Sequence, residues 1–376
     1  MKRIRMQRAR RLMRNPIGGR VKAAIAWTLL SGVFLLASCA TTGGNRPSED
    51  RNTKTREKAA RYYNEGLSSL RGGEYRDAIR LFEKSVQLDP QDPWPYNDMG
   101  IAYGKLGMLD KEISCYDKAI GLEPRFAQAL NNKGIALHML GRYDEARQSL
   151  ESAVKADMLY ESAHINLGIV LASQKRYELS LLSLDNALRL DPTSERALFN
   201  KGLVLEEWGK YENAVKTYDE LLRLRRGYAE VYLHKATCLE RLERVPEALE
   251  VLELAIQAKP DSAEAFCRRG WVLGKLGKHD DAVKSFDRAI SFNSSYAEAY
   301  AGKAACLSAL GQWEASLEAS DLALRHKPQS IDALKVKAEA LRGLGREEEA
   351  KAVLDQVKAL EAAPAVETAP QTPSEP

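Results

Sequence analysis

The chain of 376 residues lacks the short motifs that mark common catalytic sites. It has no HExxH helix, no GxSxG turn around a nucleophile and no glycine-rich loop of the kind that holds phosphates. Its five histidines occupy unrelated positions in the sequence. The sequence therefore predicts no catalytic residue, no enzyme activity, no cofactor, no metal and no small-molecule substrate.

Cysteine is scarce, and its spacing shows no pairing pattern. Apart from Cys39, the cysteines are far apart and form no CxxC, which does not indicate a disulfide framework. His234 and Cys238 lie one helical turn apart, with Cys267 further along the chain, but no other metal ligand can be named. We interpret the four cysteines as small buried residues: Cys115, Cys238, Cys267 and Cys306.

Excess basic charge is missing from the body of the chain, in spite of a formal net charge of +4. The segment 1–38 contains nine Lys and Arg and no Asp or Glu, which leaves 47 basic against 52 acidic side chains in the rest. A mildly acidic body has no general attraction for phosphates. We therefore expect no nucleic-acid partner.

Long apolar runs are absent except near the N-terminus. There, a basic stretch is followed by the uncharged residues 23–36 and then by small residues, which is typical of a signal peptide, predicted over residues 1–38. Counted generously, the uncharged stretch covers residues 23–40, a borderline length for a membrane span. An uncleaved signal anchor is the alternative.

The end of this segment, Leu36-Ala37-Ser38-Cys39, resembles the lipobox of bacterial lipoproteins. The resemblance implies that the Cys39 thiol is acylated, with palmitate among the attached chains, and that Cys39 becomes the first residue of the mature protein. Two or more acyl chains anchor a protein stably to a membrane. Because Ala40 stands where enteric lipoproteins retained in the inner membrane have aspartate, we expect the outer membrane, on its periplasmic side.

Two flanking segments lack any core-forming pattern. Residues 39–58 are predicted to be the lipid anchor and a flexible tether, because they are polar and contain Gly43, Gly44 and Pro47. Residues 362–376 include four prolines and are predicted to be a disordered tail.

Between these segments, a pattern of small and large residues recurs every 34 residues without insertions. Twelve positions after a first small residue the chain is mostly small again, and sixteen positions after it mostly large. Proline follows in five of the nine units. The first small residues are Gly66, Gly100, Gly134, Gly168, Gly202, Ala236, Gly270, Ala304 and Ala338.

This pattern closely resembles the tetratricopeptide repeat family, in which small residues at positions 8 and 20, an aromatic at 24 and proline at 32 shape each repeat. The resemblance implies an all-α fold, a right-handed α-solenoid of nine tandem 34-residue helix-turn-helix repeats over residues 59–361. Helices of about 14 residues are marginal alone, so each repeat must stack on its neighbours. The predicted repeats begin at residues 59, 93, 127, 161, 195, 229, 263, 297 and 331.

Positions 2, 5, 6, 9, 12 and 13 of the first helix tend to face a concave groove in this family. Position 6 is an amide or an acid in the first five repeats, and an exposed column of amides suits an extended peptide backbone. The alternative is that asparagine is simply a common exposed residue there. The predicted column is Asn64, Asp98, Asn132, Asn166 and Asn200.

Position 9 is aliphatic in the same five repeats, and position 5 adds Phe199. Apolar side chains on a face that meets water indicate a partner site, whereas coverage by flanking helices is the alternative. The groove is therefore predicted within residues 59–235, with an apolar row of Leu67, Ile101, Ile135, Ile169 and Leu203.

Position 7 is basic in six repeats, which we attribute to long aliphatic stems that cover a neighbouring helix while the charge reaches water. These residues are Lys133, Lys201, Lys235, Arg269, Lys303 and Lys337.

Together, the patterns predict a lipid-anchored scaffold of the cell envelope that binds other proteins or peptides, in assembly of an envelope or secretion complex. A chaperone-like receptor for extended periplasmic polypeptides is the alternative. A remote alternative is an envelope enzyme whose site is assembled across repeats.

Overall fold

The computed structural model of the protein describes residues 47–362, which form helices joined by short turns and contain no strand. The predicted all-α repeat fold is confirmed. The predicted signal peptide, Cys39, the first part of the tether and residues 363–376 lie outside the described residues.

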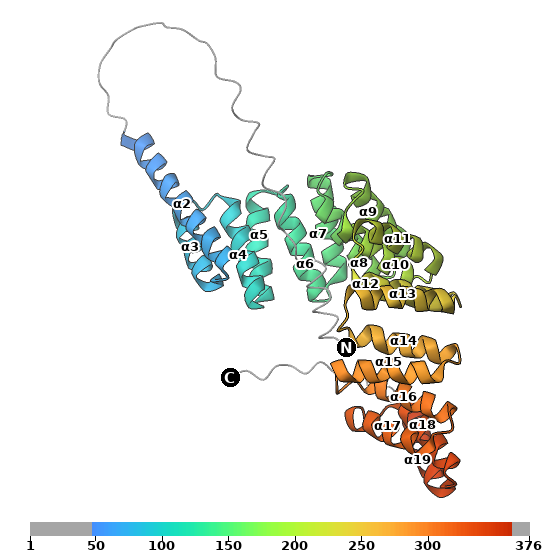
Figure 1. Cartoon of the computed structure of the whole chain (residues 1–376). Helices are drawn as coiled ribbons and strands as arrows, with labels where there is room; N and C mark the ends of the chain where they lie inside the picture. The colour runs from blue at the N-terminus through green and yellow to red at the C-terminus, as the bar shows by residue number, and fades with distance from the viewer. Residues whose placement is uncertain (1–46, 363–376) are drawn as a thin grey trace, which may run out of the picture. The chain divides into compact units, whose positions relative to one another are not determined.

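The described residues form eighteen helices in nine antiparallel pairs, one pair for each repeat (Figure 1). In repeat order the pairs are α2 (Pro47–Gly72) and α3 (Tyr75–Leu88), α4 (Pro93–Leu106) and α5 (Leu109–Leu122), α6 (Ala127–Met139) and α7 (Tyr143–Ala156), α8 (Glu161–Ser173) and α9 (Tyr177–Leu190), α10 (Glu195–Glu207) and α11 (Tyr211–Leu224), α12 (Ala229–Arg241) and α13 (Val245–Ala258), α14 (Ala263–Lys275) and α15 (His279–Phe292), α16 (Ala297–Ala309) and α17 (Trp313–His326), and α18 (Ile331–Gly343) and α19 (Glu347–Ala362).

From α4 onward, every first helix begins at the residue where a repeat begins in the sequence. Each repeat also turns at the same place, because its fifteenth residue has a positive φ angle. Glycine takes this left-handed conformation without strain, and it supplies the turn in seven repeats. Lys175 and Glu243 adopt it in the other two, with φ of 58° and 60°.

The predicted tether is wrong over its second half, because α2 begins at Pro47, well before the first predicted repeat. Residues 53–58 include the good helix formers Lys54, Arg56, Glu57 and Lys58. Once the packed part of α2 has formed, each further residue extends the helix without a new nucleation cost. A polar segment without an apolar period can therefore continue the helix outward.

The core of each repeat lies between its two helices. In eight of the nine repeats the small residue at position 8 faces a large residue at position 24, whereas repeat eight has Ser320 there. Phe286 is fully buried, and a Cβ atom added at Gly270 would lie 2.7 Å from its ring. A Cβ atom added at Gly302, in the next repeat, would approach the same ring even more closely. Repeat six instead places Ala236 and the smaller Leu252 at these two positions. Glycine also faces leucine in repeats three and four, where an added Cβ atom would lie 2.5 Å from Leu150 and 2.7 Å from Leu184. The missing Cβ atom therefore makes room for a large residue, whether aromatic or aliphatic.

The chain divides into two compact units, and the boundary falls inside α10. Unit 1 extends to Asn200 and unit 2 starts at Lys201.

No helix within residues 47–362 is long and apolar enough to cross a membrane.

A repeated ion pair joins neighbouring repeats, which was not predicted from the sequence. The basic residue at position 7 contacts an acidic residue at position 25 of the preceding repeat, on its second helix. The N–O distances are 2.6 Å in Lys133–Asp117 of unit 1, and in unit 2 they are 2.6 Å in Lys235–Asp219, 3.6 Å in Arg269–Glu253, 2.7 Å in Lys303–Asp287 and 2.7 Å in Lys337–Asp321.

Candidate functional site

The first helices of neighbouring repeats contact one another through a small set of repeat positions. In unit 1, the amide of Asn132 donates to Asn97 at 3.0 Å, from position 6 to position 5. In unit 2, the ammonium of Lys275 lies 2.7 Å from Glu240, from position 13 to position 12. We call the surface formed by positions 2, 5, 6, 9, 12 and 13 of the first helices the inner face of each unit.

Asparagine side chains link successive first helices on the inner face of unit 1. Besides Asn132 and Asn97, the amide of Asn166 donates to Asn131 Oδ1 at 2.7 Å. Within single helices, Asn97 Nδ2 donates to Asp98 at 3.0 Å and Asn131 Nδ2 to Asn132 at 3.4 Å. These bonds connect α4, α6 and α8 into one hydrogen-bonded chain, which we call the amide network.

The amide network continues at both ends. The Tyr63 hydroxyl donates to Asp98 at 2.7 Å, which adds α2. At the other end the Arg196 guanidinium donates to Asn166 Oδ1, and Asn200 Nδ2 donates to the Arg196 carbonyl at 2.7 Å. Burial lowers the pKa of Arg196, while the charge of Glu161 opposes that shift.

The expectation that the position-6 column is exposed is wrong for three of its five members. Asp98, Asn166 and Asn200 are only 5%, 1% and 3% exposed. Asn132 is half-buried, and Asn64 is exposed. Burial of these polar groups is tolerated because they form hydrogen bonds with neighbouring side chains or, for Asn200, with the Arg196 carbonyl.

Two members of the amide network, Asn97 and Asn131 at position 5, were not predicted from the sequence. Their signal is the pair of consecutive polar residues, Asn97-Asp98 and Asn131-Asn132, at positions 5 and 6 of the first helix. Each such pair supplies one side chain toward the preceding repeat and one toward the next.

The predicted apolar row is half-buried in all five repeats. Ile101 packs against the core cluster that contains Tyr116 and Leu137, and Leu67 packs against the cluster around Phe82. Ile135, Ile169 and Leu203 keep part of their surface exposed.

The placement of Phe199 as a groove residue is wrong, because its side chain is only 4% exposed. Its large ring is accommodated in the protein interior, where burial of an aromatic side chain is favourable.

Unit 2 carries a different polar cluster on its inner face. Glu206 accepts a hydrogen bond from the Tyr218 hydroxyl at 2.8 Å and lies 2.9 Å from His234 Nδ1. Burial alone would raise the pKa of Glu206, but the hydrogen bonds from His234 and Tyr218 lower it on balance. His234 is thus engaged with a carboxylate, and the described residues contain no group of three potential metal ligands.

The four cysteines are free and buried. Burial raises the pKa of the Cys115, Cys267 and Cys306 thiols to about 11 and that of Cys238 to about 12. Because the thiolate is the reactive form, these side chains are poor nucleophiles in the folded protein.

The inner faces of the two units contain the same number of repeat positions but differ in charge. In unit 1 only four of the positions are charged, three basic and one acidic. In unit 2 thirteen are charged, five basic and eight acidic. The inner face of unit 1 is therefore nearly neutral and rich in amides, whereas that of unit 2 is strongly charged and acidic on balance.

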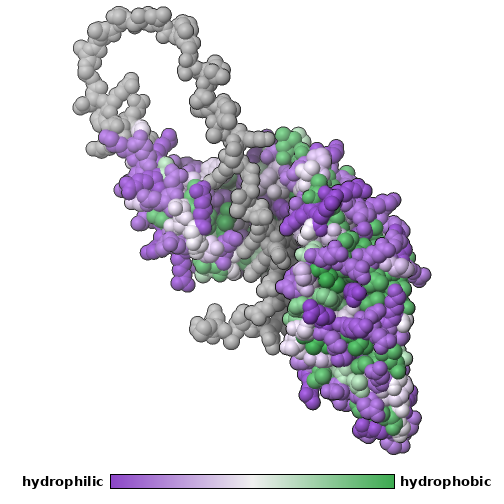
Figure 2. Space-filling model, viewed as in Figure 1, coloured by the Kyte–Doolittle hydropathy of each residue, from purple (hydrophilic) through white to green (hydrophobic). Residues whose placement is uncertain are grey.

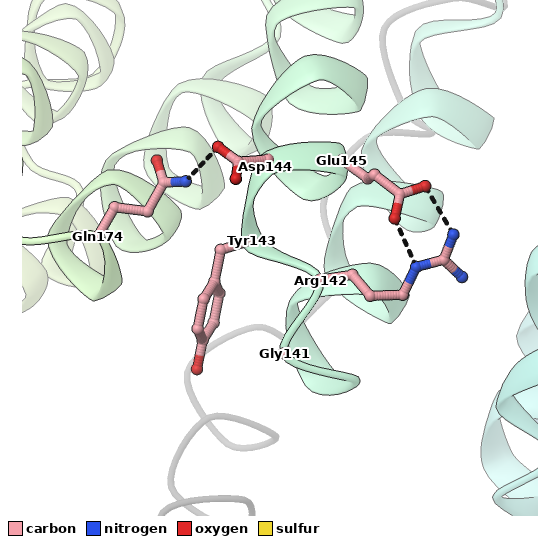
Figure 3. Close-up of a pocket in the computed structure, with 6 residues that line it drawn as sticks. All are labelled: Gly141, Arg142, Tyr143, Asp144, Glu145 and Gln174. Atoms are coloured by element: carbon pink, nitrogen blue, oxygen red, sulfur yellow. Dashed lines mark hydrogen bonds and ion pairs between the residues drawn. The ribbon is translucent and has the colours of Figure 1, made fainter.

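A pocket of about 420 Å³ lies at the turn between α6 and α7, lined by residues 141–145 and Gln174 (Figure 3). Each of its charged groups has a partner, and Gln174 Oε1 is the one buried polar atom of the lining without one. Arg142 donates to both oxygens of Glu145 at 2.7 and 2.6 Å, and Gln174 donates to Asp144 at 3.0 Å. The pocket therefore presents no arrangement of polar groups that predicts a small-molecule ligand.

Comparison with protein-family models identifies the repeats. Models described as tetratricopeptide repeats match residues 66–107, overlapping segments from 97 to 263, and residues 263–296. The chain belongs to the tetratricopeptide repeat family. Tetratricopeptide repeats mediate interactions with other proteins and peptides. A search of curated proteins finds no match to this chain.

Solved structures of other tetratricopeptide repeat proteins are similar to this one. The C-terminal part of a repeat protein from Cytophaga hutchinsonii is 15% identical, with 64% of this chain and 98% of that chain covered, and its TM-score of 0.54 supports the fold. PilF of Pseudomonas aeruginosa is 23% identical over 57% of this chain and 96% of that chain, with a TM-score of 0.49. YrrB, described as having an unusual peptide-binding site, is 26% identical over 49% of this chain and 95% of that chain, with a TM-score of 0.42.

Proposed function

We propose that the protein is a lipid-anchored scaffold of the bacterial cell envelope, which holds partner proteins on the inner faces of its tetratricopeptide repeats. The amide network of unit 1 is the observation that carries the binding part of this proposal. An asparagine side chain offers two donors and two acceptor sites, and the network uses one of each at the half-buried Asn132. The remaining donor and acceptor are available to a peptide backbone.

The fixed orientation of these amides favours binding. Asn132 is held by Asn97 from one side and by Asn131 from the other, so its free N–H and lone pair keep one direction before a partner arrives. Groups that are already ordered lose less entropy on binding. The partly exposed Ile135 and Ile169 next to the amide network would contact apolar side chains of the same partner segment.

The envelope location is supported by the sequence alone. The lipobox-like Leu36-Ala37-Ser38-Cys39 follows a basic and apolar leader, and a doubly acylated cysteine holds a protein at a bilayer. The outer membrane, with the repeats in the periplasm, is the proposed site because Ala40 follows the cysteine.

Replacement of Cys39 by Ser tests the anchor. We expect wild-type protein expressed in bacteria to incorporate labelled palmitate and to sediment with membranes, whereas Cys39→Ser loses both properties because a hydroxyl does not replace the acylated thiol. Labelling is followed on gels after a palmitate feed, with Cys115→Ser as the matched control that keeps Cys39. Equal labelling of wild type and Cys39→Ser would overturn the proposed anchor.

Photo-crosslinking in living cells tests the binding face and separates a scaffold from a chaperone-like receptor. A photoreactive amino acid is placed at Ile135 on the inner face and, as a matched control, at Gln148, which is exposed on the second helix α7. A scaffold should give one or a few discrete adducts at position 135 and none at position 148. Many adducts of varied mass at position 135 would instead support a receptor for extended polypeptides, and equal adducts at both positions would refute the inner face as the binding surface.

A further inference from the structure

Trp271 is the one aromatic residue at the inner-face positions of unit 2. It is 38% exposed, and its ring packs edge-on against the buried Phe286, with a centroid distance of 5.6 Å and an interplanar angle of 80°. On the next first helix, α16, positions 5, 6 and 9 are the small residues Ala301, Gly302 and Ala305. Trp271 is therefore a positioned aromatic surface without a bulky neighbour at those positions of α16.

Exposed acidic side chains lie at position 2 of the same helix and of the next one. Glu264 and Glu298 keep 53% and 54% of their side chains exposed. Within the protein, Glu264 pairs with Arg268 at 3.3 Å and Glu298 with Lys327 at 3.1 Å. Such exposed pairs contribute little to stability, so a basic side chain of a partner can replace or join the internal cation at small cost. An acidic partner would meet the net negative charge of this face and be repelled.

The spacing of the repeats sets the pattern that a partner must have. Packed helices lie about 8–10 Å apart, and an extended chain advances about 3.3 Å per residue. About three residues of an extended segment therefore span the distance from one first helix to the next. Side chains at every third residue of the segment would meet equivalent positions of successive repeats.

We infer that the inner face of unit 2 binds an extended basic segment of a partner protein, with a Lys or Arg side chain over the ring of Trp271 and basic residues at every third position facing Glu264 and Glu298. A cation over the face of tryptophan is attracted by the electrons of the ring. This inference rests on the proposed function only in that the repeats bind polypeptides. It concerns a different unit from the amide network, and a partner of different chemistry.

A synthetic peptide of five Lys-Thr-Gly repeats provides the probe, and its affinity for the purified protein is measured by calorimetry and by tryptophan fluorescence. We expect binding that weakens about tenfold between about 0.05 and 0.5 M salt, because screening shortens the reach of exposed charges. Trp271→Ala should weaken binding about fivefold, and Trp271→Phe should weaken it less because an aromatic ring is kept. The double variant Glu264→Gln with Glu298→Gln should weaken binding about tenfold.

Matched controls make the result specific. A Glu-Thr-Gly peptide should not bind, and a peptide of the same composition with its five lysines consecutive should bind several-fold more weakly than the spaced one. Asn64→Ala, on the inner face of unit 1, should leave the affinity unchanged. Circular dichroism establishes that each variant is folded.

Two results would overturn the inference. One is wild-type affinity in a folded Trp271→Ala variant, and the other is equal binding of the spaced and consecutive lysine peptides. Failure of the proposed function would appear separately, as a loss of specific crosslinks at position 135 or of labelling at Cys39, and neither outcome would alter the peptide measurement.

Discussion

Replacement of Asn166 by Ala is expected to lower the free energy of unfolding by about 2–3 kcal/mol. The Asn166 side chain is only 1% exposed, donates to Asn131 and accepts from Arg196. Its removal leaves a buried carbonyl oxygen and a guanidinium N–H group without this partner, and the loss of a hydrogen bond to a charged group is at the costly end of the range. Urea unfolding followed by circular dichroism measures the change.

Asn64 supplies the matched control, because it occupies the same repeat position but is exposed. Asn64→Ala should change the free energy of unfolding by less than about 0.5 kcal/mol. Asn166→Asp separates the two bonds, since the aspartate keeps an acceptor for Arg196 but has no donor for Asn131. We expect it to destabilise the protein less than Ala does. Equal stability of Asn166→Ala and Asn64→Ala would show that the amide network contributes nothing to folding.

Replacement of Gly270 by Ala should destabilise the protein by about 2 kcal/mol, although alanine is the better helix former. The new methyl carbon would lie 2.7 Å from the Phe286 ring, and the backbone at Gly302 in the next repeat also lies close to the same ring. Overpacking costs about 1–3 kcal/mol, and a buried ring that already lies close to two glycines places the cost at the upper end. The gain in helix propensity offsets only about 1 kcal/mol. Thermal and urea unfolding report the result.

Gly121→Ala is the matched control, and we expect it to raise the stability of the protein rather than lower it. Gly121 lies in α5, and no atom stands within 4 Å of an added Cβ, so Ala should stabilise the protein by up to about 1 kcal/mol. Adding Phe286→Leu to Gly270→Ala should restore part of the loss, because repeat six already combines Ala236 with Leu252. If the double variant is less stable than the sum of the single changes predicts, the steric explanation fails.

The repeat architecture could be predicted from the sequence because its causes are local and recur at a constant interval. Gly or Ala at position 8 and a large residue at position 24 identify which helices pack together, and a turn residue fifteen places into each repeat identifies where the chain reverses. The start of α2 could not be predicted in this way. A helix that grows outward from a packed segment needs no apolar period of its own.

The inner face was harder to predict because exposure depends on neighbours in other repeats. Asn166 is polar and occupies a position that faces the groove in the family, yet Asn131 and Arg196 contact it from both sides and bury it. Phe199, by contrast, is large enough to pack into the interior from position 5. Neither result follows from the periodic pattern of a single helix, since both are set by which side chains the adjacent repeats bring.

The hydrophilic surface visible in Figure 2 is interrupted by small hydrophobic patches. Among the described residues, Met158 and Leu159 are the most exposed large apolar side chains, at 74% and 76%. They occupy the turn after α7, where several other repeats have proline. The Leu159 N–H donates to Asp157 at 2.9 Å, and His164 Nε2 lies 3.1 Å from the Met158 carbonyl. The same bond from an N–H group to the Asp side chain two residues earlier also occurs in the turns that contain Pro90 and Pro192, so it holds this turn with or without proline.

The ion pairs between positions 7 and 25 have a consequence for how this protein can change length. Four successive junctions in unit 2 use the same charges in the same order, from Lys235–Asp219 to Lys337–Asp321. A gene duplication or deletion of one whole repeat there would bring together a basic and an acidic residue that already match. In unit 1 the amide network also uses the same two positions at successive junctions, with Asn132 donating to Asn97 and Asn166 to Asn131, so the same event between α4 and α8 would again bring together matching amides. A duplication or deletion of one whole repeat at these junctions therefore preserves the polar contacts that join neighbouring repeats, and the number of repeats can change without loss of those contacts.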